Sequence, residues 1–140
     1  MAELVGSQVR HHHPIQVAVE KAGIIKQGVP VISAPRPEEA LAVIEATCEE
    51  KGAPLTLVGR DWWWEAGAVS LEGQQFTVCH DRGGVTDLRI PLLGEHQLAN
   101  ATTAVAALAL LGQGGLQIPA PALREGLQAF FDHHKFLDAA

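Results

Sequence analysis

Lys21 is the first residue whose type and place in the sequence could support chemistry. It stands at the end of a stretch with a helical pattern, in the sequence EKAGII. One interpretation makes it a solvated ammonium, which the negative end of the helix dipole favours. The other makes it a buried, neutral amine, the form that reacts with electrophiles such as carbon dioxide. The carbamate so formed is an anionic oxygen ligand that suits a hard cation such as magnesium.

A second group of candidate residues, His96, Gln97 and Asn100, lies in the sequence LLGEHQLANATTA. Gly94 suits the end of a strand, and the three residues fall near the first turn of the helix predicted to follow. Gln97 and Asn100 are three residues apart, so both side chains can project to one side of that helix. An amide donates and accepts hydrogen bonds at once, which suits the edge of an adenine ring. The alternative is that these side chains satisfy free backbone groups at a helix start.

Histidines gather near both ends of the chain: His11, His12 and His13 near the start, and His133 and His134 near the end. Successive residues on a helix point about 100° apart, so at most two of the first three could share one ion without further ligands. We therefore interpret the first group as a polar terminal segment. We assign no role to the second group.

The sequence contains three consecutive tryptophans, Trp62, Trp63 and Trp64, whose side chains would alternate between two faces if they lay on a strand. Alternation along a strand places Trp62 and Trp64 on one face and Trp63 on the other. One face is expected to join the core. The other is expected to form an exposed aromatic patch, which is typical of a contact surface.

Motifs for cradling a triphosphate or for nucleophilic catalysis do not occur in the sequence. There is no GxxxxGK[ST] pattern, and the glycine-rich stretch 112–115 contains no lysine or hydroxyl residue that would complete one. No Ser-His-Asp arrangement stands out either. The sequence therefore offers no recognisable phosphate-binding loop.

The first half of the chain predicts a βαβ unit that follows one helix. Residues 15–25 have a helical pattern that ends at Gly23, and the β-branched residues of GVPVIS predict a short buried strand. Residues 37–51 predict an amphipathic helix with glutamates on its outer side, and residues 55–59 predict a second apolar strand. Strand, helix and strand within about thirty residues indicate two parallel strands with a right-handed crossover.

The second half predicts a different arrangement, because the pattern changes at Trp62. Three short alternating stretches predict antiparallel hairpins with turns at EGQ and DRGG: residues 68–71, 75–79 and 85–91. Two later stretches predict helices: residues 98–111 and 121–131. We find no linker or repeat, and we therefore expect a single α/β domain over residues 1–140.

Length, composition and charge limit the classes of protein to which the chain can belong. It has 140 residues, of which 47% are hydrophobic and 19% charged, enough for one domain with a core. The net charge of −6 disfavours nucleic acid and anionic membranes as partners. No stretch reaches the ~18 apolar residues of a membrane helix. Two cysteines without a CxxC pattern, and a first segment unlike a secretory signal, favour a cytoplasmic location.

Four stretches, in order, resemble the folylpolyglutamate synthase/dihydrofolate synthase family of the Mur ligase superfamily. They are VAVEKAGIIKQGVPVISAP, LTLVGRD, IPLLGEHQLANATTAVAAL and IPAPALREGL, and they lie within residues 15–127. The specific motifs are EKAGIIKxGVPV and LxGxHQxxNAxxAxAA. The resemblance implies a partial three-layer α/β central domain of the Mur ligase type, which combines the parallel βαβ unit with the small antiparallel hairpin region.

The resemblance also implies an activity and roles for residues. In the family, ATP phosphorylates the carboxylate of dihydropteroate or of a folate, and the amine of glutamate then attacks the acyl phosphate to form an amide. Magnesium neutralises phosphate charge and aligns the groups. By this resemblance the catalytic residue Lys21, as a carbamate, would ligate the Mg2+ ion, and Asn100 would approach the adenine. His96 and Gln97 belong to the same nucleotide-binding motif.

Both ends of the chain depart from the family pattern. VGSQVRHHHP, within residues 1–14, replaces an expected Asp-His pair, and QAFFDHHKFLDAA, residues 128–140, replaces an expected Pro-Gly-Arg segment. The family's phosphate loop and early magnesium ligands would lie before Met1. We therefore expect a fragment of the central ATPase domain, from a truncated or frame-shifted gene or as a short paralogue. Such a fragment is expected to be inactive alone, to bind ATP weakly or not at all, and to self-associate through exposed strand edges. The alternative is a non-catalytic α/β binding or interaction module.

Overall fold

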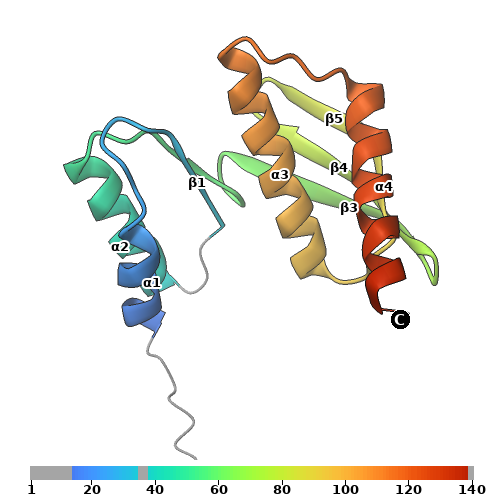
Figure 1. Ribbon diagram of the computed structural model, residues 1–140, viewed down its shortest axis with the longest axis horizontal. Helices are drawn as coiled ribbons and strands as arrows, with labels where there is room; N and C mark the ends of the chain where they lie inside the picture. The colour runs from blue at the N-terminus through green and yellow to red at the C-terminus, as the bar shows by residue number, and fades with distance from the viewer. Residues whose placement is uncertain (1–13, 35–37, 139–140) are drawn as a thin grey trace, which may run out of the picture. The chain divides into compact units, whose positions relative to one another are not determined.

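The computed structural model describes residues 14–34 and 38–138, and Figure 1 shows the helices and strands in chain order. The chain forms two compact units. Unit 1 consists of Met1–Val29 and Pro35–Pro54, and unit 2 consists of Pro30–Ala34 and Leu55–Ala140. The described strands and the last two helices belong to unit 2. The expectation of one domain over the whole chain stays a prediction.

Unit 1 is built on two helices, α1 (Pro14–Ala22) and α2 (Glu38–Glu50), which pack on each other. They bury small and aliphatic side chains: Ala18, Ala22, Ala40, Ile44 and Cys48. The loop that follows α1 is tied to the end of α2, because Lys51 Nζ donates a hydrogen bond to the carbonyl oxygen of Ile25 at 2.7 Å. Both predicted helices are confirmed, and α1 ends directly before Gly23 as expected.

The two short strands β1 (Val31–Ser33) and β2 (Leu55–Leu57) pair in parallel, with Val31 opposite Leu55 and Ser33 opposite Leu57. This pairing confirms the predicted βαβ connection, in which α2 joins the two strands. The sequence predicts that the first strand is buried, but all three residues of β1 are only half-buried. The reason is that the described part of this sheet has only two strands, so each strand is also an edge.

The strands β3 (Trp62–Ser70), β4 (Gly73–His80) and β5 (Gly83–Ile90) form an antiparallel sheet in that order. The predicted hairpins are confirmed. However, β3 begins at Trp62, well before the expected range 68–71, because the three tryptophans pair with the end of β4. The predicted alternation of these side chains holds: Trp62 and Trp64 pack against the core, whereas Trp63 is 37% exposed.

Both outer strands of this sheet contain a bulge. On β3 the register against β4 shifts between Ala66 and Val69. Between β4 and β5 it shifts after Phe76, which lies opposite Leu88. Asp87, inside the second bulge, has a φ of 55°, a left-handed conformation that few residues other than glycine adopt.

Two helices, α3 (Glu95–Gln113) and α4 (Ala120–Asp138), cover one face of the antiparallel sheet. Helix α3 packs mainly on β3, and α4 packs on β5. The core between the sheet and these helices is aliphatic and aromatic: Phe76, Val78, Leu88 and Ile90 from the strands, Leu98, Ala101 and Val105 from α3, and Leu127 from α4. Over the described ranges 14–34 and 38–138, no helix combines the length and apolarity that crossing a membrane requires.

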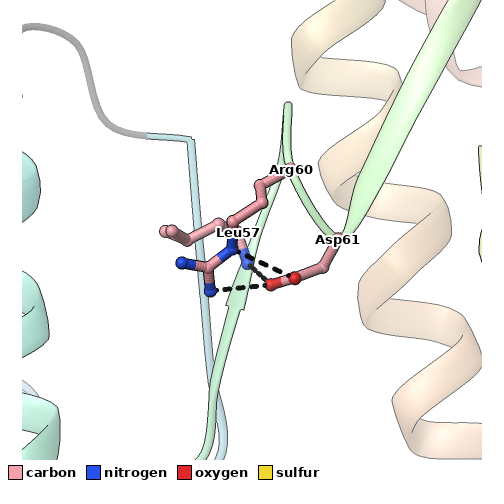
Figure 2. Close-up of polar contacts among 3 residues, drawn as sticks. All are labelled: Leu57, Arg60 and Asp61. Atoms are coloured by element: carbon pink, nitrogen blue, oxygen red, sulfur yellow. Dashed lines mark hydrogen bonds and ion pairs between the residues drawn. The ribbon is translucent and has the colours of Figure 1, made fainter.

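One carboxylate fixes the turn between β2 and β3. Asp61 accepts hydrogen bonds from the backbone nitrogen of Leu57 at 2.8 Å and from the Arg60 guanidinium at 3.1 and 3.2 Å (Figure 2). The hydrogen bond from Arg60 is the largest cause that lowers the pKa of the Asp61 carboxyl. Partial burial opposes this shift, while the Leu57 N–H and the positive charge of Arg60 add to it. The charged form of Asp61 therefore stabilises this turn.

We expect Gly84→Ala to destabilise unit 2 by about 1–3 kcal/mol, because a Cβ at this place in β5 would overlap the carbonyl oxygen of Val78 and lie 3.1 Å from Cys79 Cα. The obstacle is backbone and cannot rotate away. Gly126→Ala is the matched control, since a Cβ there meets nothing within 4 Å and a helical alanine gains about 0.5–1 kcal/mol over glycine. Urea denaturation measures both. Equal stability of the two variants would contradict the packing described for β4 and β5.

We expect Asp61→Asn to lower the stability of the chain at neutral pH by on the order of 1 kcal/mol or less, because the carboxylate is partly exposed and screened by solvent. Its folded pKa is lowered, so its contribution is present above the ordinary carboxyl pKa of about 3.9 and is lost as the pH falls through and below that value. The stability difference between the two proteins should therefore shrink towards acid pH.

Denaturation curves at pH 7 and at stepwise lower pH measure this difference. Asp81→Asn is the control, because the Asp81 side chain is 87% exposed. A difference that stays constant down to pH 3, or one equal to that of the control, would count against the role of Asp61.

Candidate functional site

The start of α3 is shaped by a glycine that no other residue can easily replace. Gly94 is the N-cap residue of α3, and its φ is 111°. A Cβ at this position would also lie 2.8 Å from two ring atoms of His96. The His96 ring therefore lies close against Gly94, and the cap makes no side-chain hydrogen bond to the helix. The chain turns sharply here and begins α3 three residues earlier than the predicted Leu98.

A buried amide side chain on β4, that of Gln74, makes hydrogen bonds to the same turn. Gln74 is 5% exposed, and its Nε2 donates hydrogen bonds to the carbonyl oxygens of Leu92 and Gly94, both at 2.9 Å. The carbonyl of Gly94 also accepts the backbone N–H of Gln97 at 3.2 Å. The turn that precedes α3 is thus attached to the antiparallel sheet.

The side chains of Gln97 and Asn100 lie together, as their spacing predicts. Asn100 Nδ2 donates a hydrogen bond to Gln97 Oε1 at 3.5 Å. Both residues line a groove of about 700 Å³. The other lining residues are mostly aliphatic or small: Leu92, Ala101, Ala104, Leu108, Ile118, Ala122, Leu123, Gly126 and Leu127. A pair of amides beside apolar walls can hold a flat, polar-edged ring, because the walls contact its faces and the amides its edge.

The remaining predicted site residues lie elsewhere. His96 is exposed at the start of α3 and does not line the groove. Lys21 belongs to unit 1, in the last turn of α1, and is exposed, which agrees with the solvated interpretation rather than the buried one. His11–His13 lie outside the described residues. His133 and His134 lie in α4, and nothing is assigned to them.

Thiol and metal chemistry find little support among the described residues. Burial raises the pKa of the Cys48 thiol, and burial followed by the nearby charge of Glu65 raises the pKa of the Cys79 thiol. Both shifts disfavour the reactive thiolate. In the ranges 14–34 and 38–138, no three residues of the His, Cys, Asp or Glu types are grouped so that they could hold a metal ion. These residues therefore do not form a magnesium site by themselves.

A second hollow of about 720 Å³ lies near the other end of α3. Trp62 and His80 line it, and their rings stack with centroids 4.4 Å apart. Gln113 and Gln117 supply amides there. The hollow shares Leu108, Ile118 and Leu123 with the groove, so these side chains stand between the two.

Two parts of the site are absent from the sequence-based prediction. One is the wall contributed by α4, for which the spacing of Leu123 and Leu127 on one helical face was the available signal. The other is Gln74, which the alternation with Phe76 and Val78 places on the core face of β4. A polar residue at a core-facing position is the signal that could have found it.

Comparison with known proteins gives consistent relatives, although no family model matches the chain. The chain is 34% identical over 118 residues to the dihydrofolate synthase/folylpolyglutamate synthase of Bacillus subtilis (strain 168), across 80% of this chain and 26% of that protein. It is 33% identical over 94 residues to the folylpolyglutamate synthase of Lacticaseibacillus casei, across 67% of this chain and 22% of that protein. The chain spans about a quarter of the length of these curated relatives.

Solved structures agree with the sequence relatives. The folylpolyglutamate synthetase from Lactobacillus casei matches with a TM-score of 0.75 and 32% identity, over 82% of this chain and 30% of that chain. A folylpolyglutamate synthase complex with AMPPCP and folate matches with a TM-score of 0.77 and 32% identity, over 84% of this chain and 29% of that chain. The predicted α/β fold class of the Mur ligase type is thereby confirmed.

We expect Lys21 in this chain to stay an ammonium and not to form a carbamate, because it is exposed and the described residues supply no grouped metal ligands that would stabilise the carbamate. Carbon-13 NMR of the chain in labelled bicarbonate measures this directly. Lys21→Ala and Lys26→Ala are compared, since Lys26 is an exposed lysine close by in the sequence. A carbamate resonance that disappears only in Lys21→Ala would overturn this expectation.

Proposed function

Over the region that it covers, the chain belongs to the folylpolyglutamate synthase/dihydrofolate synthase family, and we propose that it forms part of an ATP-dependent ligase that joins glutamate to dihydropteroate or to a folate. The relatives that support this carry those names, and the matching complexes contain the ATP analogue AMPPCP with folate. One solved relative, from E. coli, was captured with DHPP and ADP. The substrates proposed are therefore small molecules: ATP, a folate or dihydropteroate, and glutamate.

The observation that carries the proposal is the amide pair at the groove between α3 and α4. The edge of adenine has both hydrogen-bond donors and acceptors, and the amides of Gln97 and Asn100 offer both in return. The faces of the ring are apolar, as are the walls given by Ala101, Leu123 and Leu127. We assign adenine recognition to Asn100 and Gln97. His96 belongs to the same motif and directly precedes Gln97 in the sequence, but it does not line the groove.

The proposed reaction has two steps. An oxygen of the substrate carboxylate bonds to the γ-phosphorus of ATP, and the bond to the β-phosphate oxygen breaks, which releases ADP. The amine of glutamate then bonds to the acyl carbon, phosphate leaves with the bonding electrons, and the amine loses a proton. The described residues contribute to the first step by holding the adenine end, so that the phosphates extend from a fixed point.

The role of Lys21 as the carbamate ligand of Mg2+ is proposed for the family's complete site only. The described residues of this chain do not by themselves supply a set of ligands for the ion, and the two reaction steps are written without it. A non-catalytic interaction module, the second candidate, predicts no adenosine binding at Gln97 and Asn100, whereas part of an ATP-dependent ligase predicts such binding.

We expect adenosine and ATP to bind the chain weakly and with affinities within a few-fold of each other, because the sequence has no phosphate-cradling loop. Asn100→Leu should weaken adenosine binding about fivefold, the usual effect of one lost hydrogen bond. Gln113→Leu is the matched control, since it removes an amide from the same helix but outside the groove. NMR titration, followed at the groove residues, measures all three proteins.

Two results would contradict these binding expectations. Shifts that cluster around Trp62 and His80 instead of Asn100 would place the ligand in the second hollow. An affinity for ATP that exceeds the affinity for adenosine a hundredfold would show a phosphate site that the sequence does not indicate.

A further inference from the structure

Gln74 is a polar residue at a position where its strand otherwise faces the core. Its neighbours on the same face, Phe76 and Val78, are 2% and 0% exposed. A buried amide is costly unless its hydrogen bonds are made. Gln74 meets this cost by donating to two backbone carbonyls, those of Leu92 and Gly94, which lie 18 and 20 residues further along the chain.

These two carbonyls belong to residues that shape the groove. Leu92 lines the groove, and Gly94 is the N-cap residue of α3. The carbonyl of Gly94 accepts both Gln74 Nε2 and the backbone N–H of Gln97. The side chain of Gln97 in turn accepts the hydrogen bond of Asn100. Hydrogen bonds therefore connect the buried amide on β4, through the Gly94 carbonyl, to the backbone of Gln97, whose side chain pairs with Asn100 at the groove.

We propose that Gln74 is a positioning residue, which sets the orientation of Gln97 and Asn100 by fixing the two carbonyls that precede α3. This inference rests on the proposed function, since it concerns the same groove. The physical reason is that α3 has no side-chain cap and begins at a glycine with a φ of 111°, so its own first turn does little to hold its direction. Gln74 supplies that restraint from the sheet.

A purely structural role makes a different prediction. If Gln74 only satisfied buried carbonyls, its loss would lower the stability of unit 2 as a whole, and all slowly exchanging amides would respond alike. If it positions the start of α3, its loss opens that turn locally. The Gln97 amide then exchanges faster, while the ladder between β4 and β5 keeps its relative protection.

The test compares Gln74→Met with Gln75→Met in the 140-residue chain. Methionine keeps the length of glutamine but donates no hydrogen bond, and Gln75 is exposed on the same strand. We expect Gln74→Met to speed exchange of the Gln97 amide about tenfold more than that of Val78, and to weaken adenosine binding about fivefold. Gln75→Met should change neither. Equal acceleration of both amides in Gln74→Met would overturn the proposal.

A measurement on the unaltered chain keeps the inference testable if Gln74→Met does not fold. The side-chain NH2 protons of Gln74 should be protected from exchange with water, and saturation with adenosine should slow them and the Gln97 amide by the same factor. Exchange of these protons at the rate of a free amide would overturn the proposal. If adenosine does not bind at all, the proposed function fails, whereas the comparison of Gln97 and Val78 still decides whether Gln74 fixes the turn.

Discussion

The apolar face of the three-stranded sheet β3–β5 is the constraint on which the rest of unit 2 depends. Phe76, Val78, Leu88 and Ile90 point to one side, and water must be excluded from them. Two helices do this, with α3 mainly on β3 and α4 on β5. The groove is a consequence of this division, because its walls are the flanks of the two helices, and the small residues Ala104, Ala122 and Gly126 leave it open.

The turns before and after this sheet contain backbone groups whose hydrogen bonds are made by side chains, a carboxylate in one turn and an amide in the other. Before β3, the carboxylate of Asp61 accepts the N–H of Leu57 and the guanidinium of Arg60. After β5, the amide of Gln74 donates to the carbonyls of Leu92 and Gly94. Each turn is thereby attached by a side chain, since a backbone polar group left unpaired inside the protein would cost about 1–3 kcal/mol. The charged side chain, Asp61, is the more exposed of the two, whereas the neutral side chain, Gln74, is buried.

Much of the fold follows from local pattern, and the site follows only in part. The glutamate-lined pattern of α2 and the short strands on either side predict the parallel pair β1–β2, because the period of the apolar residues differs between helix and strand. The place of Gln97 and Asn100 on one side of α3 follows from their spacing. The extension of β3 to Trp62, the wall given by α4 and the bonds of Gln74 depend on partners far along the chain. The pattern of residues within one segment does not show which distant segments it contacts. For the same reason the sequence alone did not decide whether Lys21 is buried or exposed.

The bulges in β3 and β5 affect how the sheet can meet other strands. A straight outer strand presents evenly spaced N–H and C=O groups, and a strand from another molecule can add to it in register, as in amyloid. A bulge bends the strand and breaks this even spacing. On β5 the bend coincides with Asp87, whose exposed carboxylate adds a negative charge to this outer strand. Each outer strand of the described sheet is thus interrupted near its middle, which disfavours growth into a fibril by strand addition.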